Sequence, residues 1–256
     1  AFCQDENTTI DLTGINVIEN KAFNHCKAKE IINADSVDNI ISAAFDNSFF
    51  YNKKVLKNQC VVIGHYLLKA DETAYRLEIP SNVETTYVNV HLNKVKEVVV
   101  HNLKILECIL DLPQKLIIAK DTPFFSKISK LKMKGLKYID VEDGNPFYSS
   151  ENGVLFTKNK KYLLKFPPGR TGLYKIPEGV NTIDENSFAF SNIEEVIMPS
   201  TMRNLKTFAF YNSYLKSVDF GSGLERIGNP HPESGVFSQC GNLKSISFPK
   251  QVNLPH

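Results

Sequence analysis

The sequence lacks the features that mark several large classes of protein. No run of residues approaches the roughly 18 uncharged apolar residues that a membrane-spanning helix needs. The chain has 30 basic and 28 acidic residues, so its net charge of +2 favours neither nucleic acid nor an anionic membrane as a partner. With 256 residues and 42% hydrophobic content, it does have enough apolar material for a substantial core.

Paired cysteines are also missing. The five cysteines are an odd number, and none has C-x-x-C spacing: Cys3, Cys26, Cys60, Cys108 and Cys240. This pattern argues against a disulfide framework and against a zinc site. At the start of the chain, Ala1 and Cys3 are small residues two positions apart, as in the tail of a secretory signal. We expect residues 1–8 to be a tail that begins at the end of a removed export signal, with a simple frayed start as the alternative.

The polar residues form no recognisable catalytic group. The six histidines never have the i, i+4 or H-E-x-x-H spacing that places two zinc ligands on one helical face. No G-x-S-x-G motif is present. Four carboxylates are candidates for a glycosidase pair, but a stacked-coil fold gives them a broad sheet and no cleft: Asp184, Glu185, Glu194 and Glu195. We therefore expect no enzyme activity, no bound metal and no cofactor.

The chain repeats itself instead. Residues 209–220, "AFYNSYLKSVDF", are echoed by "SFAFSNIEEVIM" at 187–198 and "VFSQCGNLKSISF" at 236–248. One column of this repeat is always phenylalanine: Phe23, Phe45, Phe188, Phe210 and Phe237. Three residues later a second column holds only cysteine or serine: Cys26, Ser48, Ser191, Ser213 and Cys240. The phenylalanines are expected to form an internal aromatic stack, with the small residues where the chain turns.

A third pattern places apolar residues at x, x+3 and x+5. It is clearest at Ile193, Val196 and Met198, at Leu215, Val218 and Phe220, and at Leu243, Ile246 and Phe248. The pattern returns mostly every 22 residues, which is the period of a solenoid coil. Its last two apolar residues alternate with a polar one, and this alternation predicts a strand. One coil cannot bury its own apolar face, so stacked coils must bury it against one another.

A longer repeat divides the chain into two related halves, about 9–135 and 136–256. Three pairs of segments lie 96 or 97 residues apart: "FFYN" and "PFYS", "HYLLK" and "KYLLK", "LEIPSNV" and "YKIPEGV". Each half carries one lengthened coil. In the second half, residues 154–156 and 162–164 are predicted to be two strands of a β-hairpin around a polar tip. Asn152-Gly153 supplies the turn before it.

These residues closely resemble the BspA-type leucine-rich repeat family, whose pattern runs roughly I-P-x-x-V-x-x-I-x-x-x-A-F-x-x-C-x-x-L-x-x-I-x-I-P. Ile176-Pro177, Val180, Ile183, Phe188, Ile193, Val196 and Met198 fill that pattern in order. The segment "GNPFYSSENGVLF" at 144–156 also matches a hairpin that the family often carries. The resemblance implies an exported bacterial protein, at the cell surface or secreted, with the periplasm as a further option. It also implies a role in adhesion or in binding host or neighbouring-cell molecules.

We therefore expect a mainly β repeat solenoid of about ten right-handed coils with short helical or irregular turns. Residues 9–256 would form this single leucine-rich-repeat-like solenoid as a monomer, with one parallel sheet and two β-hairpin insertions. Between residues 84 and 135 the phenylalanine column disappears, so the number of coils there stays open.

Two surfaces are candidates for binding. In the expected strands at 193–198, 215–220 and 243–248, six side chains should point outward in two columns: Glu195, Ile197, Ser217, Asp219, Ser245 and Ser247. A protein or an extended glycan can lie against such a face, as repeat proteins commonly use theirs. The rival is the basic hairpin tip, which holds Lys158, Lys160 and Lys161.

One further cluster is basic: "KISKLKMKGLK" at 127–137 interleaves five lysines with four apolar residues. With the apolar residues turned inward, the lysines would line one exposed surface. That surface would attract sulfated glycan or DNA, or would simply keep a coil edge soluble.

The function expected from the sequence is non-catalytic binding or adhesion to an extracellular or host protein, or to a glycan. Nucleic acid is not an expected partner. Two other classes stay open. A carbohydrate-active enzyme or accessory module would need a deep pocket with close carboxylates, and a structural spacer would show a featureless face without affinity for any ligand.

Overall fold

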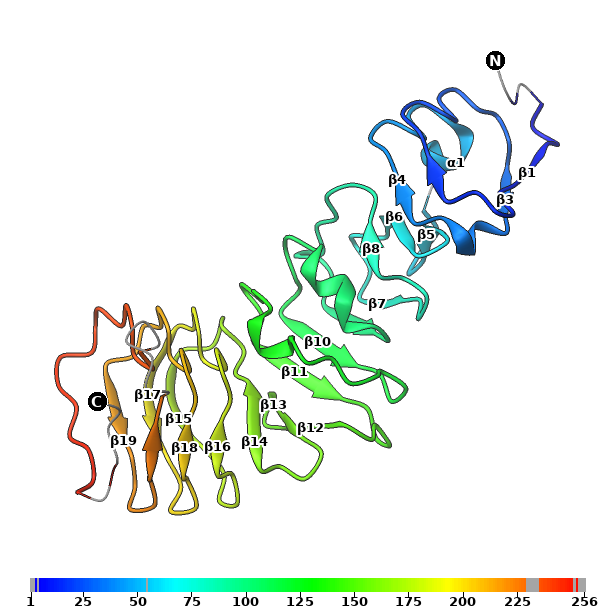
Figure 1. Cartoon of the computed structure of the whole chain (residues 1–256). Helices are drawn as coiled ribbons and strands as arrows, with labels where there is room; N and C mark the ends of the chain where they lie inside the picture. The colour runs from blue at the N-terminus through cyan, green and yellow to red at the C-terminus, as the bar shows by residue number, and fades with distance from the viewer. Residues whose placement is uncertain (1–2, 4, 54, 229–234, 251, 253–256) are drawn as a thin grey trace. The chain divides into compact units, whose positions relative to one another are not determined.

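The computed structural model describes residues 3, 5–53, 55–228, 235–250 and 252. Over these residues the chain is a β-solenoid of about ten turns with almost no helix (Figure 1). This confirms the fold class expected from the sequence. The chain forms two compact units, Ala1–Leu110 and Asp111–His256. The long repeat divides the chain after residue 135, whereas the two compact units divide it after Leu110. The division into two related halves therefore remains a prediction.

The first unit is built from short strands that pair mostly in parallel, one coil to the next. Its strands are β1 (Thr9–Asp11), β2 (Val17–Ile18), β3 (Glu30–Ile32), β4 (Asn39–Ile40), β5 (Cys60–Ile63), β6 (Tyr66–Ala70), β7 (Arg76–Ile79), β8 (Thr85–Thr86) and β9 (Glu97–Val100). The parallel pairs are β1 with β3, β2 with β4, β6 with β8, and β7 with β9. Strands β5 and β6 are antiparallel, which confirms the first hairpin insertion.

Three short helical segments interrupt the strands of the first unit. They are η1 (Ala34–Ser36), α1 (Phe49–Asn52) and η2 (Leu103–Glu107). Helix α1 is a single turn, and it begins where the Ser48 hydroxyl accepts a hydrogen bond from the Tyr51 amide at 3.1 Å. In the related segment of the second half, "PFYS" at 146–149, the last two residues begin a strand, so the same residue pattern takes two conformations.

The second unit has two parallel runs of strands and one antiparallel insertion. Its elements are β10 (Lys115–Ile118), η3 (Ile128–Lys130), β11 (Tyr138–Val141), β12 (Tyr148–Glu151), β13 (Val154–Thr157), β14 (Tyr162–Lys165), β15 (Gly172–Lys175), β16 (Thr182–Ile183), β17 (Ile193–Ile197), β18 (Asn204–Leu205), β19 (Ser217–Asp219) and β20 (Arg226–Ile227). One run orders β15, β17 and β19, and the other orders β14, β16, β18 and β20. Strands β10 and β11 form a further parallel pair.

The insertion of the second unit is the predicted hairpin, with one more strand than expected. Strands β13 and β14 pair antiparallel around the polar tip, as the sequence indicated. Strand β12 also pairs with β13 through the two-residue turn Asn152-Gly153. Both residues have positive φ, 50° and 76°, as a type I′ turn requires. The insertion is therefore a three-stranded antiparallel sheet.

The phenylalanine column forms the predicted aromatic stack. In the second unit, Phe166, Phe188, Phe210 and Phe237 stack in turn, with centroid separations of 4.8, 4.7 and 5.3 Å. Phe188 and Phe210 are fully buried. In the first unit Phe23 and Phe45 stack at 5.4 Å. Each fully buried ring contributes on the order of 2–3 kcal/mol of hydrophobic stabilisation, so the stack is a major part of the core.

The cysteine and serine column lies at the turns beside this stack. Cys26, Ser48, Ser191 and Ser213 are buried there, and Cys240 is partly buried. The Ser48 hydroxyl donates to the Phe45 carbonyl at 2.6 Å, and the Cys240 thiol donates to the Phe210 carbonyl at 2.9 Å. At Ser48 and Cys240 the column residue therefore satisfies a backbone carbonyl, and cysteine and serine can replace each other there because both are small donors.

One expected strand is wrong. Residues 243–248 form no strand, although Ile246 and Phe248 pack against the core and Phe220 lies 5.0 Å from Phe248 between ring centroids. A strand requires a regular ladder of backbone bonds to its neighbour. This coil instead closes a turn from the Leu243 amide to the Cys240 carbonyl at 3.1 Å. The apolar spacing therefore predicted burial correctly and strand pairing incorrectly.

Lys165 ends β14 with its side chain buried, only 2% exposed. Its ammonium nitrogen donates to the Ser129 carbonyl at 2.7 Å and to the Asn186 carbonyl at 3.3 Å. Burial lowers the pKa of this amine to about 7. Lys165 therefore ties the basic segment 127–137 to the body of the unit.

Candidate binding site

The predicted sheet face exists in β15, β17 and β19. Glu195 is the register partner of Ser217, and Ile197 is the register partner of Asp219, so the two predicted columns are real. Glu195, Ser217 and Asp219 are exposed, and Ile197 is partly buried. The columns begin one coil earlier than expected, because Leu173 and Lys175 of β15 pair with Glu195 and Ile197.

Ser245 and Ser247 do not extend the columns as strand residues. Both are exposed, but they lie on the irregular segment described above. The structure thus brings four of the six predicted side chains together in a paired sheet. The face holds one large exposed apolar side chain, Leu173, which is 56% exposed.

The hairpin tip is exposed at all three predicted lysines. Lys160 donates to Glu151 at 2.7 Å in an ion pair across the hairpin. The pair neutralises part of the basic character on which the prediction rested.

The other parallel run forms a groove that the sequence did not indicate. Four register partners follow one another across β14, β16, β18 and β20: Tyr162, Thr182, Asn204 and Arg226. All four line one open groove of about 480 Å³. Tyr162 is 38% exposed and Arg226 is exposed, whereas Thr182 is buried. The groove therefore has a polar floor with an aromatic ring at one end and a guanidinium at the other.

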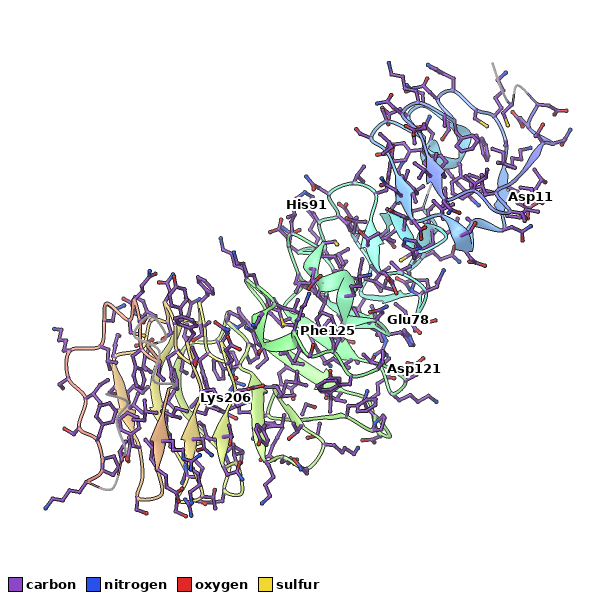
Figure 2. The ribbon with its side chains drawn as sticks, viewed as in Figure 1. Asp11, Glu78, His91, Asp121, Phe125 and Lys206 are labelled. Carbon is purple, nitrogen blue, oxygen red and sulfur yellow. The ribbon has the colours of Figure 1, made fainter. Side chains whose placement is uncertain are left out.

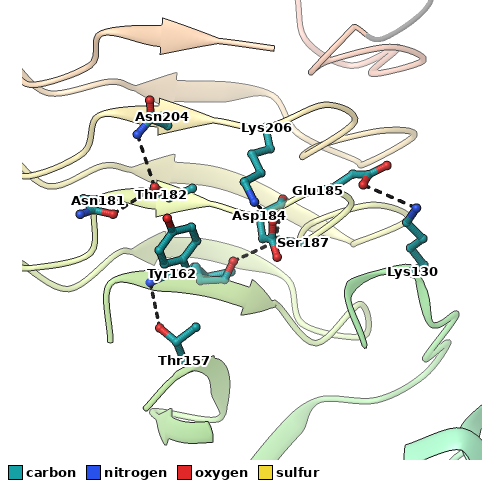
Figure 3. A network of polar contacts seen from close by, with 11 residues as sticks. Lys130, Thr157, Tyr162, Asn181, Thr182, Asp184, Glu185, Ser187, Asn204 and Lys206 are labelled. Carbon is teal, nitrogen blue, oxygen red and sulfur yellow. Dashed lines mark hydrogen bonds and ion pairs between the residues drawn. The ribbon is translucent and has the colours of Figure 1, made fainter. Parts of the chain in front are cut away.

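Local hydrogen bonds hold the floor of this groove in place (Figure 3). The Asn204 amide nitrogen lies 3.5 Å from the Thr182 hydroxyl, which itself donates to Asn181 at 3.0 Å. The Tyr162 amide donates to the Thr157 hydroxyl at 3.2 Å, which anchors the start of β14. The floor residues are thus ordered by their own coil and by the next one.

The charged side chains beside the floor are mostly paired. Lys206, marked in Figure 2, donates to Asp184 at 2.7 Å, and its ammonium lies 5.3 Å from the centroid of the Tyr162 ring. Glu185 lies 3.6 Å from Lys130 (Figure 3). Lys206 and Glu185 both line the groove, so its rim carries charges of both signs.

A weak signal for this groove was present in the sequence. Tyr162, Thr182, Asn204 and Arg226 are spaced by 20, 22 and 22 residues, which is the coil period. Each lies directly before an apolar residue of a second short strand. The four side chains are chemically unlike, so comparison of residue types alone does not reveal the column.

The described residues do not place three or more His, Cys, Asp or Glu side chains where they could hold a metal ion. All five cysteines are free thiols. Burial and a contact with Cys3 raise the pKa of the Cys26 thiol to about 11, and burial raises that of Cys60 to about 12. In the part of the chain that the structure describes, no helix is long and apolar enough to cross a membrane.

Comparison with known protein families assigns the chain to one of them. The family model "BspA type Leucine rich repeat region (6 copies)" matches residues 1–105 and 173–254, which is more than half of the sequence. The chain therefore belongs to the BspA-type leucine-rich repeat family, as the repeat pattern suggested. No curated protein matches the chain.

Three solved structures are similar to this chain. A leucine rich cell surface protein from Faecalibacterium prausnitzii has a TM-score of 0.48 and 20% identity over 93% of this chain and 58% of that one. The pneumococcal vaccine antigen PcpA has a TM-score of 0.42 and 22% identity over 95% and 51%. A leucine-rich repeat protein from Eubacterium ventriosum has a TM-score of 0.35 and 16% identity over 70% and 68%. The chain spans about half the length of the pneumococcal antigen.

Proposed function

We propose that this chain is a non-catalytic binding module, exported to the bacterial surface, that holds a partner protein in the groove of β14, β16, β18 and β20. The observation that carries the proposal is the register of Tyr162, Thr182, Asn204 and Arg226 along that groove. The family supports export.

The groove has the residue types that dominate protein recognition. Tyrosine and arginine are enriched among the residues whose truncation weakens protein complexes most. Tyr162 and Arg226 are three strand spacings apart, which is roughly 14 Å. A polypeptide segment spans that distance, and the partly exposed Asn204 side chain between the anchors offers hydrogen-bonding groups to its backbone.

The geometry fits binding better than catalysis. Glu185 is the only carboxylate among the lining residues, and it is paired with Lys130. Glycoside hydrolysis uses two carboxyl groups facing each other across the scissile bond. The predicted face of β15, β17 and β19 remains a second proposal for the contact surface, but apart from Leu173 it lacks comparable anchors.

The test is a binding screen of the purified chain against a panel of extracellular-matrix proteins, followed by variants. Tyr162→Ala combined with Arg226→Ala should weaken binding at least tenfold, with an unchanged melting temperature as the folding control. Ser217→Arg combined with Ser245→Arg, and removal of the hairpin tip, should leave the affinity within about twofold.

Two outcomes would contradict the proposal. If the serine variant or the tip deletion abolishes binding while the Tyr162 and Arg226 variant keeps it, the groove is the wrong surface. If none of the panel binds at micromolar concentration, the spacer interpretation is favoured instead.

A further inference from the structure

A second hollow lies over the turns of the second unit, independent of the proposed protein-binding groove. It consists of two adjoining depressions of about 290 and 310 Å³ that share Phe190 and Asn192 in their walls. The first is bordered by Lys132 and Lys134 of the basic segment. The second is bordered by Tyr214. The two depressions meet at Phe190 and Asn192, and together they are called the trough.

The backbone at Phe190 is held in a conformation that a bulky residue rarely adopts. The position two residues after each of the five phenylalanines of the sequence column has positive φ: His25, Asn47, Phe190, Asn212 and Gln239, at 57°, 56°, 60°, 48° and 61°. Asparagine and histidine tolerate this left-handed region, whereas an aromatic residue there is an outlier. The chain thus accepts backbone strain to place an aromatic ring at this point.

Burial of the Phe190 ring does not offset that strain. Phe190 is 47% exposed, and its ring touches Tyr211 edge-on at 5.4 Å between centroids. Tyr214, at the other side of the second depression, is 49% exposed. Two half-exposed aromatic rings on one trough are typical of a surface that stacks against a flat ligand.

The trough is cationic. Its lining contains two lysines and no carboxylate. The Lys132 ammonium lies 5.9 Å from the Phe190 ring centroid. Among the described residues, neither Lys132 nor Lys134 forms an ion pair, in contrast to the neighbouring Lys130, which pairs with Glu185.

The polar groups of the trough are mostly uncharged amides and hydroxyls. Asn192, Asn212, Gln239 and Asn242 supply paired donors and acceptors. Ser191 also lines the trough. It is 1% exposed, and its hydroxyl has no hydrogen-bond partner in the described structure, unlike Ser48 and Cys240 at equivalent positions. A buried hydroxyl without a hydrogen-bond partner normally destabilises the fold. A ligand hydroxyl that bonds to it would remove this cost.

From these features we infer that the trough binds an anionic oligosaccharide, with sugar rings against Phe190 and Tyr214 and a carboxylate or sulfate beside Lys132 and Lys134. The amides match the vicinal hydroxyls of a sugar, since each offers one donor and one acceptor. An acidic peptide fits less well. The repeated carboxylates of such a peptide would meet only Lys132 and Lys134, and the rest of the lining is uncharged.

The proposal is tested by calorimetric titration of the full chain with a hyaluronan hexasaccharide, which carries carboxylates, and a chondroitin sulfate hexasaccharide, which adds sulfates. Chitohexaose, which is uncharged, and a twelve-residue polyglutamate serve as comparisons. At least one anionic hexasaccharide should bind, and its Kd should rise with NaCl concentration because the contact is partly ionic. Chitohexaose and polyglutamate should bind at least tenfold more weakly.

Phe190→Asn is the decisive variant, because asparagine already occupies this column at Asn47 and Asn212. This variant should keep or raise the melting temperature, and it should lower the affinity for the anionic hexasaccharide at least fivefold. Lys132→Gln combined with Lys134→Gln should lower that affinity by a similar factor. The matched control, Lys158→Gln combined with Lys160→Gln at the hairpin tip, should leave the affinity for the hexasaccharide unchanged. Tyr162→Ala combined with Arg226→Ala should leave it unchanged too.

Several results would overturn the inference. If polyglutamate binds as tightly as the anionic hexasaccharides, the trough is a site for acidic peptides. If chitohexaose binds as tightly, the ligand's charge does not contribute to binding. Unchanged affinity in the Phe190 and lysine variants would place the sugar elsewhere. Absence of binding by both anionic hexasaccharides would refute the site. If Phe190→Asn fails to fold, Tyr214→Ala supplies the same test of stacking.

Discussion

The rings of Phe188 and Phe210 stack with centroids 4.7 Å apart and planes inclined by 17°. Phe210 also stacks on Phe237, so its ring lies between two neighbours and is fully buried. Phe210→Ala should therefore lower the free energy of unfolding by about 3–5 kcal/mol, because it removes a large buried ring and leaves a cavity.

Denaturant melts measure this loss, with Phe124→Ala as the matched control. Phe124 is 60% exposed, and its truncation should cost less than about 1 kcal/mol. A loss at Phe210 as small as that at Phe124 would contradict the stacked core.

The buried amine of Lys165 makes stability depend on pH. Its pKa falls from an ordinary value of 10.5 to about 7 in the folded chain. Between those values the unfolded chain binds the extra proton and the folded chain does not, so stability rises with pH from about 7 to 10.5. The slope from this one group approaches about 1.4 kcal/mol per pH unit. Below pH 7 the full cost of burying the charge is present.

Lys165→Met should remove that rise. The measurement is the free energy of unfolding of both proteins at pH 6 to 10, because other groups titrate equally in each and cancel in the difference. The difference curve should bend near pH 7 and slope upward above it. Two parallel curves would show that the amine stays charged in the folded chain, held by the Ser129 and Asn186 carbonyls.

Asn145 is a buried polar residue whose four hydrogen bonds are all made. Its amide nitrogen donates to the carbonyls of Ala119 and Thr122 at 2.9 and 3.2 Å, and its carbonyl oxygen accepts from the amides of Phe147 and Tyr148 at 2.9 Å each. Asn145→Leu should cost more than about 3 kcal/mol, because four backbone groups lose their partner at once.

Thermal or chemical denaturation measures this cost. Asn159→Leu is the comparison, since Asn159 accepts bonds from Thr157 and Lys161 at the exposed hairpin tip. That change should cost less than about 1 kcal/mol. Similar losses at both positions would mean that the network around Asn145 adds little to stability.

The sequence predicted those parts of the fold in which one residue type recurs. The phenylalanine stack and the hairpin of β13 and β14 were visible because aromatic and β-branched residues return at fixed spacing. Phe166 also belongs to the stack and lies 22 residues before Phe188, but Lys165 precedes it and Gly169 follows three residues later, so it lacks the flanking residues that revealed the others. Strands of two residues, such as β16 and β18, are too short to show an alternation, so the second sheet was not predicted.

The candidate sites were harder to predict for a physical reason. Core positions accept few residue types, whereas Tyr162, Asn204 and Arg226 lie on a surface where each coil varies independently. Only the register of the backbone joins them into one groove. The left-handed conformation at Phe190 was similarly hidden, because its neighbours in the column are ordinary turn residues and the sequence alone gives no φ angle.

The strand register has a consequence for how such a chain changes in evolution. Thr182, Asn204 and Arg226 occupy equivalent backbone positions 22 residues apart, and each pairs in the same parallel register with the coil before it. Loss of residues 182–203 would join Asn181 to Asn204 without altering the junction, and Phe166 would then meet Phe210 in place of Phe188. Whole coils are therefore interchangeable units of genetic gain and loss, and a lineage can lengthen or shorten its binding surface by recombination within the gene while the packing rules of the interior stay the same.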